Sequence, residues 1–254
     1  MSDFDPGLAL FTFLCILLVF VLAFLSVIFI EKRSDRRGVM IQSIFRSNFI
    51  LLGLPLVSAI CGGKGDGLTS MMIAIVIPLF NILAIITLEI FRDTKATIRQ
   101  IILKIIKNPL IVAIFLGLIV KILRLSLNKV PPLTSAISSL AQIATPLLLF
   151  ILGASFQISS ISENKYRILF CVLGRLICAP AIAFFLGIVI GLRGISLVVL
   201  LSVFASPTAT NSYRMAQQMG GDADLASGII VISTIVSCFT MVAWIVLLRR
   251  FSFI

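Results

Sequence analysis

The sequence predicts an all-α polytopic membrane protein of about eight transmembrane helices, and three observations support this fold class. The 254 residues are 60% hydrophobic and only 12% charged, whereas soluble domains are roughly 45–50% apolar and about 25% charged. The apolar residues form long stretches, and the basic residues behind the net charge of +11 lie mostly between them. Because a water-soluble globule cannot hide so much apolar surface, the expected partner is the lipid bilayer, and nucleic acid is not expected.

Eight stretches are long enough to cross about 30 Å of hydrocarbon. The first, 8–30, carries no charge and follows Asp3 and Asp5 instead of a basic segment, which argues against a signal peptide. The others are 40–60, 70–90, 109–127, 134–156, 167–191, 195–215 and 225–248. The loops between them are short, so we expect no water-soluble domain.

The basic residues predict the orientation in the membrane. Twelve Lys and Arg residues lie in loops on one side of the predicted spans and five on the other, or seven when Lys121 and Arg124 are included. The positive-inside rule then places both termini outside a plasma membrane, which we expect to be a bacterial inner membrane. The segment 91–108 is predicted to be a basic cytoplasmic linker. Five isoleucines between positions 98 and 106 form one helical stripe in it, so it is either a short amphipathic helix or a loop.

Two of the spans, 40–60 and 195–215, carry polar residues and proline near their centres. The first contains Arg46-Ser47-Asn48 followed by Gly53-Leu54-Pro55, and the second contains Ser206-Pro207-Thr208-Ala209-Thr210-Asn211. Within lipid, a helix breaks only where it lines a cavity or is buried in protein. We therefore expect Pro55 and Pro207 each to begin a second half-helix, and two such N-termini would attract an anion at the membrane midplane. The alternative is a simple proline kink in each span, as expected at Pro78, Pro146 and Pro180.

The spacing of the two broken spans predicts an internal repeat. Pro55 and Pro207 are 152 positions apart. Shifted back by this distance, the span 167–191 overlaps 8–30 and the span 225–248 overlaps 70–90, whereas 109–127 and 134–156 have no counterpart. The pattern predicts a five-plus-five inverted repeat without its first two helices. Residues 1–90 would be an incomplete first repeat of three helices, and residues 109–254 a complete second repeat of five.

Several of these segments resemble a known family. The run Phe45-Arg46-Ser47-Asn48-Phe49, with Gly53-Leu54-Pro55-Leu56 after it, resembles the fourth helix of the auxin efflux carrier family, which includes malate-permease-type members. Residues 145–155 resemble the seventh helix of that family, residues 206–222 its ninth helix and the following loop, and residues 233–237 its tenth. The resemblance implies ten helices in two inverted repeats, with the fourth and ninth crossing at their breaks and an organic anion bound near the crossing.

The residues beside the breaks form the candidate substrate-binding set, which is Asn48, Gly53, Pro55, Ser206, Pro207, Thr208 and Asn211. The amides of Asn48 and Asn211 can donate hydrogen bonds to a carboxylate, and hydrogen bonding between helices is the alternative. Three charged residues within the spans are candidate charge partners, namely Arg46, Arg175 and Glu89. Either arginine attracts or balances an anion, or else snorkels to the cytoplasmic surface, and Glu89 is a candidate partner for either one.

These features predict a secondary active transporter of a small organic anion such as a carboxylate, working by alternating access about a site between the breaks. An enzyme is not expected, because the chain has no His, no Asp within a predicted span, and no phosphate-binding loop around Lys64. We expect no cofactor and no bound metal, and the coupling ion (H⁺ or Na⁺), the direction of transport and a homodimer stay open. The missing helices leave a second interpretation, a truncated non-transporting remnant or a subunit that requires a partner.

Overall fold

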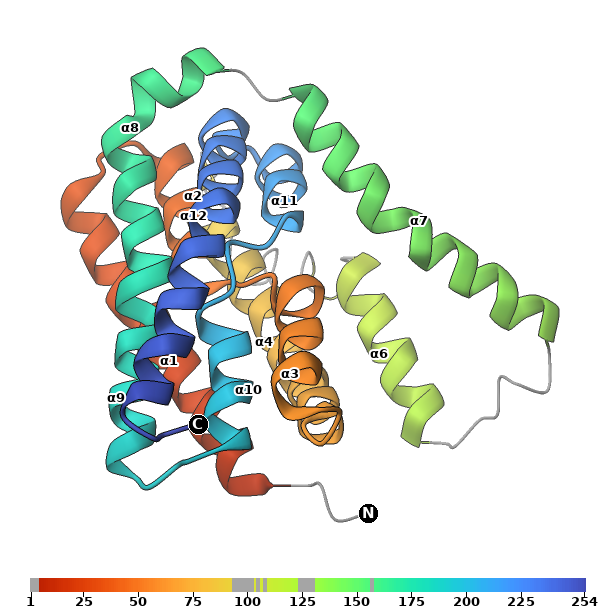
Figure 1. The fold of residues 1–254 in the computed structure, drawn as a ribbon. Helices are drawn as coiled ribbons and strands as arrows, with labels where there is room; N and C mark the ends of the chain where they lie inside the picture. The colour runs from red at the N-terminus through yellow and green to blue at the C-terminus, as the bar shows by residue number, and fades with distance from the viewer. Residues whose placement is uncertain (1–4, 93–102, 104–105, 107–108, 123–130, 156–157) are drawn as a thin grey trace.

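The computed structural model describes residues 5–92, 103, 106, 109–122, 131–155 and 158–254, and most of these residues are helical (Figure 1). No strand occurs in these ranges, so the predicted all-α class is confirmed for them. Four helices are long and apolar enough to cross a membrane: α1 (Pro6–Ile30), α4 (Asp66–Ile90), a continuous helix at Ile161–Val189, and α12 (Ala223–Arg250). They match the predicted spans 8–30, 70–90, 167–191 and 225–248.

Local sequence explains where the first of these helices begins. Pro6 occupies the first turn of α1, where its missing N–H needs no acceptor. The Asp5 carboxylate accepts a hydrogen bond of 3.0 Å from the Leu8 N–H and so caps the helix. One face of α1 is buried against the bundle, while leucines on the other face are exposed. A helix that is apolar all round is expected where lipid is the solvent.

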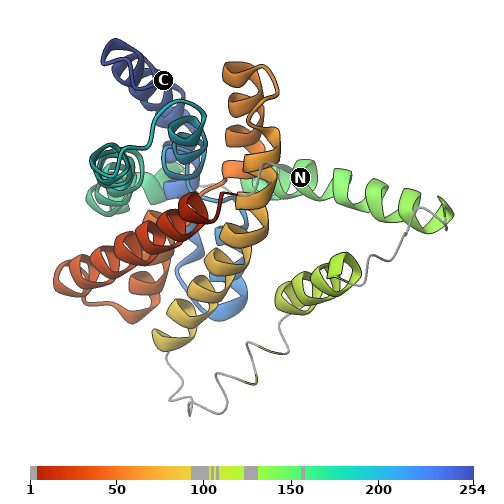
Figure 2. The same ribbon diagram turned by 90° about the horizontal axis from the view of Figure 1, so that it is seen from below.

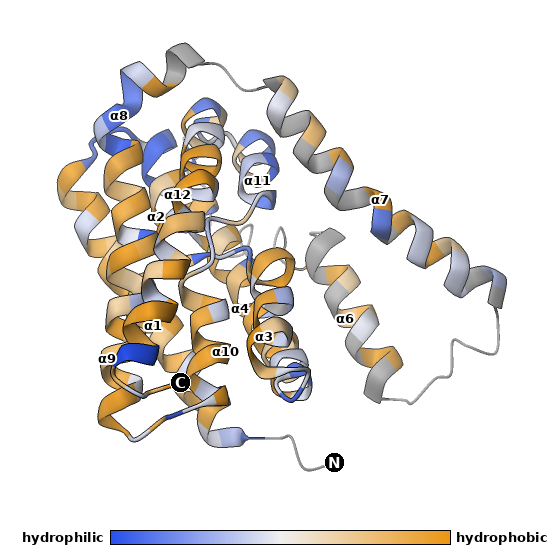
Figure 3. Ribbon diagram, viewed as in Figure 1, coloured by the Kyte–Doolittle hydropathy of each residue, from blue (hydrophilic) through white to orange (hydrophobic). Residues whose placement is uncertain are grey.

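Six helical units form one bundle: α1, α2 with α3, α4, α8 with α9, α10 with α11, and α12 (Figures 1 and 2). The helix α8 (Ile158–Leu173) continues through the π-helical turn η3 (Gly174–Cys178) into α9 (Ala179–Val189). In Figure 3 the bundle helices are apolar over most of their length, and hydrophilic residues gather at the end where α8 and α11 lie. Helix α1 begins and α12 ends at the opposite end of the bundle (Figure 1).

Two further helices lie beside this bundle (Figure 2), namely α6 (Pro109–Ile122) and α7 (Pro131–Ser155). They coincide with the predicted spans 109–127 and 134–156 in so far as these are described. The isoleucine stripe between 98 and 106 falls almost wholly outside the described residues. The count of eight membrane spans, the internal repeat of 1–90 and 109–254, and the side of the membrane on which the termini lie remain predictions.

Both spans that were predicted to be broken are broken. In the first, α2 (Ser34–Phe45) ends before three non-helical residues, and the chain resumes as the π-helical turn η1 (Phe49–Gly53) and α3 (Leu54–Cys61). In the second, α10 (Ile195–Phe204) is followed by six non-helical residues and then by α11 (Asn211–Met219).

The predicted positions of the two breaks are corrected by the structure. Pro55 does not begin a half-helix, because the break lies upstream at Arg46–Asn48 and the helix that follows it is continuous from Phe49 to Cys61. Proline within a membrane helix is tolerated where a local π-helical turn satisfies the freed backbone groups, and the π-helical turn η1 lies just before Pro55. Pro207 lies within the second break, and α11 starts four residues later at Asn211. The residue before a proline is disfavoured in the α conformation, which is consistent with the helix ending ahead of Pro207.

Candidate substrate site at the crossing of two broken helices

The two breaks meet each other through their backbones. Ser47 and Thr208 form an isolated antiparallel bridge. The Asn48 N–H donates to the Pro207 carbonyl at 2.8 Å, and the Ala209 N–H donates to the Arg46 carbonyl at 3.3 Å. Each break thus supplies the hydrogen-bond partners that the other lacks within its own helix. This mutual pairing explains how extended backbone is tolerated in the middle of an apolar protein.

Side chains of the second break complete the crossing. The Thr208 hydroxyl donates to the Ser43 carbonyl at 2.9 Å, and the Thr208 N–H donates to the Ser233 hydroxyl of α12 at 3.3 Å. The Ser206 hydroxyl donates to the Ser202 carbonyl at 2.6 Å. Ser206 and Thr208 are fully buried. The structure thus places these two predicted site residues in the framework of the crossing, together with the buried Pro207.

A cavity of about 200 Å³, lined by both polar and apolar side chains, lies beside the crossing. Its lining comes from both breaks and from α4, and comprises Arg46, Ser47, Asn48, Ile50, Ile77, Phe80, Asn81, Ala209, Thr210 and Asn211. Of the predicted site residues, the structure therefore brings Arg46, Asn48 and Asn211 together at one cavity. Gly53, Pro55, Ser206, Pro207 and Thr208 are not part of the described lining.

The polar groups that line the cavity have spare hydrogen-bonding capacity. The Arg46 guanidinium donates to the Asn81 carbonyl oxygen at 2.6 Å and to the Met215 sulfur. A guanidinium has five N–H donors, so three remain without a partner among the described residues. The side-chain amides of Asn48 and Asn211, which are half-buried, have no hydrogen-bond partner among the described residues. The buried Ser47 hydroxyl has none either. Buried donors without partners are costly unless a ligand or water meets them.

The electrostatics of the cavity favour an anion. Arg46 is 5% exposed and brings a full positive charge. The chain leaves the crossing as the N-terminal ends of η1 and α11, and a helix N-terminus carries roughly half a positive charge. Thr210, the N-cap residue of α11, makes no side-chain capping bond, and the N–H groups of Ser212 and Tyr213 donate to the carbonyls of Ala209 and Thr210 at 3.0 and 3.3 Å. No acidic residue belongs to the described lining.

Sequence reasoning missed seven of the ten lining residues, and three of these are polar: Ser47, Asn81 and Thr210. Asn81 lies in the middle of α4, is 3% exposed, and orients the Arg46 guanidinium. The signal for it was present, because a lone amide in an otherwise apolar span needs a partner within the protein. Ser47 was passed over as part of the run between Arg46 and Asn48, and only its orientation toward the cavity distinguishes it.

The remaining candidate charge partners lie elsewhere. Glu89, near the end of α4, forms an ion pair with Arg92 at 3.6 Å. The guanidinium groups of Arg46 and Arg175 have other partners, so the structure does not support the predicted pairing of Glu89 with either of them. Arg175 neither lines the cavity nor snorkels to the surface, because it is 0% exposed and its donors are bound to backbone carbonyls.

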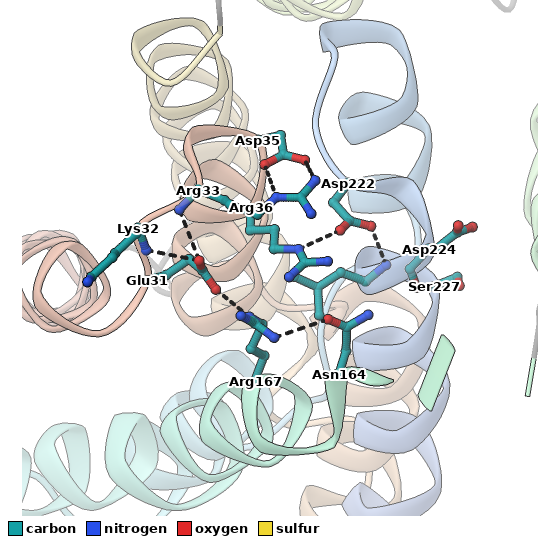
Figure 4. A network of polar contacts seen from close by, with 11 residues as sticks. Glu31, Lys32, Arg33, Asp35, Arg36, Asn164, Arg167, Asp222, Asp224 and Ser227 are labelled. Atoms are coloured by element: carbon teal, nitrogen blue, oxygen red, sulfur yellow. Dashed lines mark hydrogen bonds and ion pairs between the residues drawn. The ribbon is translucent and has the colours of Figure 1, made fainter. Parts of the chain in front are cut away.

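A network of charged residues ties the hydrophilic end of the bundle together (Figure 4). Glu31, at the end of α1, pairs with Arg167 of α8. Arg36 of α2 pairs with Asp222 at 2.9 Å, and the same carboxylate caps α12 by accepting from the Leu225 N–H. The α1–α2 connection is thereby fastened to both α8 and α12.

This network predicts an acid-sensitive stability. Burial raises the pKa of Glu31, but hydrogen bonds from Arg167 and from the N–H groups of Arg33 and Lys32 outweigh it and leave that pKa below its ordinary value. A depressed folded-state pKa gives stability that is complete above the unfolded value of about 4.3 and is lost as pH falls through the folded value. We expect Glu31→Gln to unfold more easily at pH 7, by about 2 kcal/mol, and this difference to shrink below about pH 4. Thermal unfolding in detergent at several pH values measures it, and a pH-independent difference would contradict the assignment.

The arrangement defines the class of protein. Helices long and apolar enough to cross a membrane, packed around two broken helices that cross beside a cavity, form the architecture of a membrane transporter. Comparison with known families matches residues 6–245 to the family described as membrane transport protein. The chain belongs to this family, which is of the auxin efflux carrier and malate permease type, as its sequence predicts.

A curated relative agrees with the family. The chain is 26% identical over 237 residues to a protein of Methanocaldococcus jannaschii named as an uncharacterized transporter. The match covers 91% of this chain and 75% of that protein. Family and relative together identify a multi-pass membrane transporter.

Proposed function

We propose that the protein is a secondary carrier of small organic anions and that it holds a carboxylate in the cavity at the crossing. One observation supports this most: the cavity is lined by Arg46, which keeps three of its five N–H donors unpaired among the described residues, by the unpartnered Ser47 hydroxyl, and by the side-chain amides of Asn48 and Asn211. An arginine presents its donors in a fork that matches a carboxylate, and amides add directional donors. No described acid at the cavity repels the ligand.

The size of the cavity narrows the class of substrate. The cavity has a volume of about 200 Å³. Pockets for drug-sized ligands are typically about 300–1,000 Å³. A mono- or dicarboxylate of a few carbon atoms fits this volume, whereas a large aromatic anion does not unless the cavity widens.

Alternating access requires the crossing to face each side of the membrane in turn. The charged network of Figure 4 closes the hydrophilic end of the bundle around α1, α8 and α12. We propose that opening toward that end separates Glu31 from Arg167 and Arg36 from Asp222. The backbone pairing at the crossing stays intact in both states, so the two breaks move together.

Arg46 provides the direct test of the proposed function. Wild type, Arg46→Lys and Arg46→Gln are reconstituted in proteoliposomes, and counterflow of labelled malate, succinate, lactate and acetate is measured. We expect wild type to exchange at least one of these anions and Arg46→Gln to exchange it roughly 30-fold more slowly, which corresponds to about 2 kcal/mol for a charge-assisted hydrogen bond. Arg46→Lys keeps the charge but loses the fork, so its exchange is expected to be intermediate.

A matched control separates the site from the general charge of the region. Arg214 lies on α11, is exposed, and is not part of the cavity lining. Arg214→Gln is expected to exchange at the wild-type rate. Normal exchange by Arg46→Gln would refute the site. Absence of exchange by folded wild type for every anion tested would instead favour the interpretation as a subunit that requires a partner.

A further inference from the structure

The guanidinium group of Arg175 lies where the two broken helices end. Arg175 belongs to η3, the π-helical turn between α8 and α9, and it is 0% exposed. Its Nε donates to the Ser206 carbonyl at 2.9 Å. One terminal nitrogen donates to the carbonyls of Ile44 and Phe45 at 3.2 and 3.0 Å, and the other donates to those of Val203 and Phe204 at 2.7 and 3.0 Å.

These five acceptors all belong to helix C-terminal ends. Ile44 and Phe45 are the last residues of α2, Val203 and Phe204 are the last residues of α10, and Ser206 follows them. The final carbonyls of a helix have no partner within the helix. One side chain therefore caps both half-helices at once, and its five N–H donors are matched by five carbonyl oxygens.

The charges at this place also balance. A helix C-terminus carries roughly half a negative charge, so two such ends contribute about one negative charge in the interior of the bundle. The guanidinium contributes one positive charge and stays protonated at neutral pH. The crossing is thus electrically asymmetric, with its C-terminal ends neutralised by Arg175 and its N-terminal ends open to the cavity that Arg46 lines.

We propose that Arg175 is a built-in cation that takes the place of a coupling metal ion at the crossing, so that anion transport by this protein does not depend on Na⁺. The inference rests on the proposed function and concerns its energy source. In transporters with broken helices, unwound carbonyls and half-helix C-terminal ends are common Na⁺ ligands. Here the Arg175 guanidinium donates to the corresponding carbonyls. Because it is part of the chain, it moves together with the crossing and is never released.

The first test needs no substrate. Thermal unfolding of wild type, Arg175→Lys and Arg175→Gln in detergent is compared in choline chloride and in NaCl of equal concentration. We expect wild type and Arg175→Lys to unfold at the same temperature in both salts. Arg175→Gln, which loses the positive charge, is expected to unfold at a lower temperature in choline and to gain at least about 2 °C in NaCl, since a ligand that binds only the folded state stabilises it.

The second test measures transport. Counterflow of labelled malate is followed with Na⁺ or choline as the main cation. We expect the wild-type rate to be unchanged, and the rate of Arg175→Gln to be at least tenfold lower in choline and partly restored by Na⁺ or by methylguanidinium. Arg193 is the matched control, because it donates to the carbonyls of Ile188 and Leu192 near the end of α9 but is exposed at the surface. Arg193→Gln is expected to resemble wild type in both salts.

The outcomes separate this proposal from the function on which it rests. A rise in wild-type stability or counterflow caused by Na⁺ would overturn the proposal, and so would a folded Arg175→Gln that responds to no cation. If Arg175→Gln does not fold, the test rests on wild type and Arg175→Lys. A higher unfolding temperature of either protein in NaCl than in choline chloride would contradict the proposal. Absence of counterflow in every variant, with the unfolding results as expected, would refute the proposed function and leave the role of Arg175 in place.

Discussion

Replacing Asn48 and Asn211 together with alanine is expected to slow uptake of a labelled dicarboxylate by at least about 100-fold. Both side chains line the cavity, one from each broken helix, and neither side-chain amide has a hydrogen-bond partner within the described part of the chain. A hydrogen bond to a charged group contributes about 1.5–3 kcal/mol, so each lost amide costs roughly tenfold or more in affinity. The measurement is the initial rate of uptake into proteoliposomes at low substrate concentration.

The same experiment shows whether the effect belongs to the site. The hydrogen bond from position 48 to the Pro207 carbonyl is donated by the backbone N–H, which the alanine variant retains. The double variant is therefore expected to insert and to unfold like wild type. Gln217 and Gln218 on α11 are exposed and lie outside the lining, so their alanine variants serve as amide controls. Uptake by the Asn48→Ala/Asn211→Ala variant at the wild-type rate would remove both residues from the binding site.

Replacing Gly53 with alanine is expected to destabilise the protein by about 1–3 kcal/mol, the usual cost of overpacking. A Cβ atom at this position would lie 2.7 Å from the Ser202 Cβ and 2.8 Å from the Ser202 carbonyl oxygen. Ser202 belongs to α10, so its backbone would have to move away from η1. Gly53 is thus required by the close approach of the two broken helices.

The readout for Gly53→Ala is thermal unfolding in detergent, together with the yield of folded protein. The expected loss corresponds to a fall in unfolding temperature of roughly 2–10 °C for a chain of this size. Gly117 in α6 is the matched control, because a Cβ there meets nothing within 4 Å. Gly117→Ala should be neutral or slightly stabilising, given the higher helix propensity of alanine. A wild-type unfolding temperature for Gly53→Ala would contradict the close packing at Ser202.

The sequence was sufficient for the long spans because one physical constraint dominates them. Backbone groups in lipid must be satisfied within the segment, so a long apolar run without charge has few alternatives to a helix. This reasoning found α1, α4, α12 and the continuous helix at Ile161–Val189. It also found which two spans are broken, since polar residues in such runs need a partner inside the protein.

The same reasoning misplaced the first break because it relied on a local rule. Proline does not always break a helix in a membrane protein, and Pro55 lies within the continuous helix Phe49–Cys61, just after the π-helical turn η1. The actual break at Arg46–Asn48 is determined by pairing with residues 207–209, far away in the chain. The role of Arg175 was inaccessible for the same reason. Its depth in the span was visible, but its five acceptors come from the ends of α2 and α10 and from the break after α10.

The way the crossing is held has an evolutionary consequence. The bonds between the two breaks are made by backbone groups of Arg46, Asn48, Pro207 and Ala209, and the helix ends are held through carbonyls by Arg175. Exchanging the side chains at positions 47, 48 and 211 leaves all of these bonds in place. Evolution can therefore change the substrate through a few point substitutions around the cavity. The backbone contacts that hold the crossing stay unchanged.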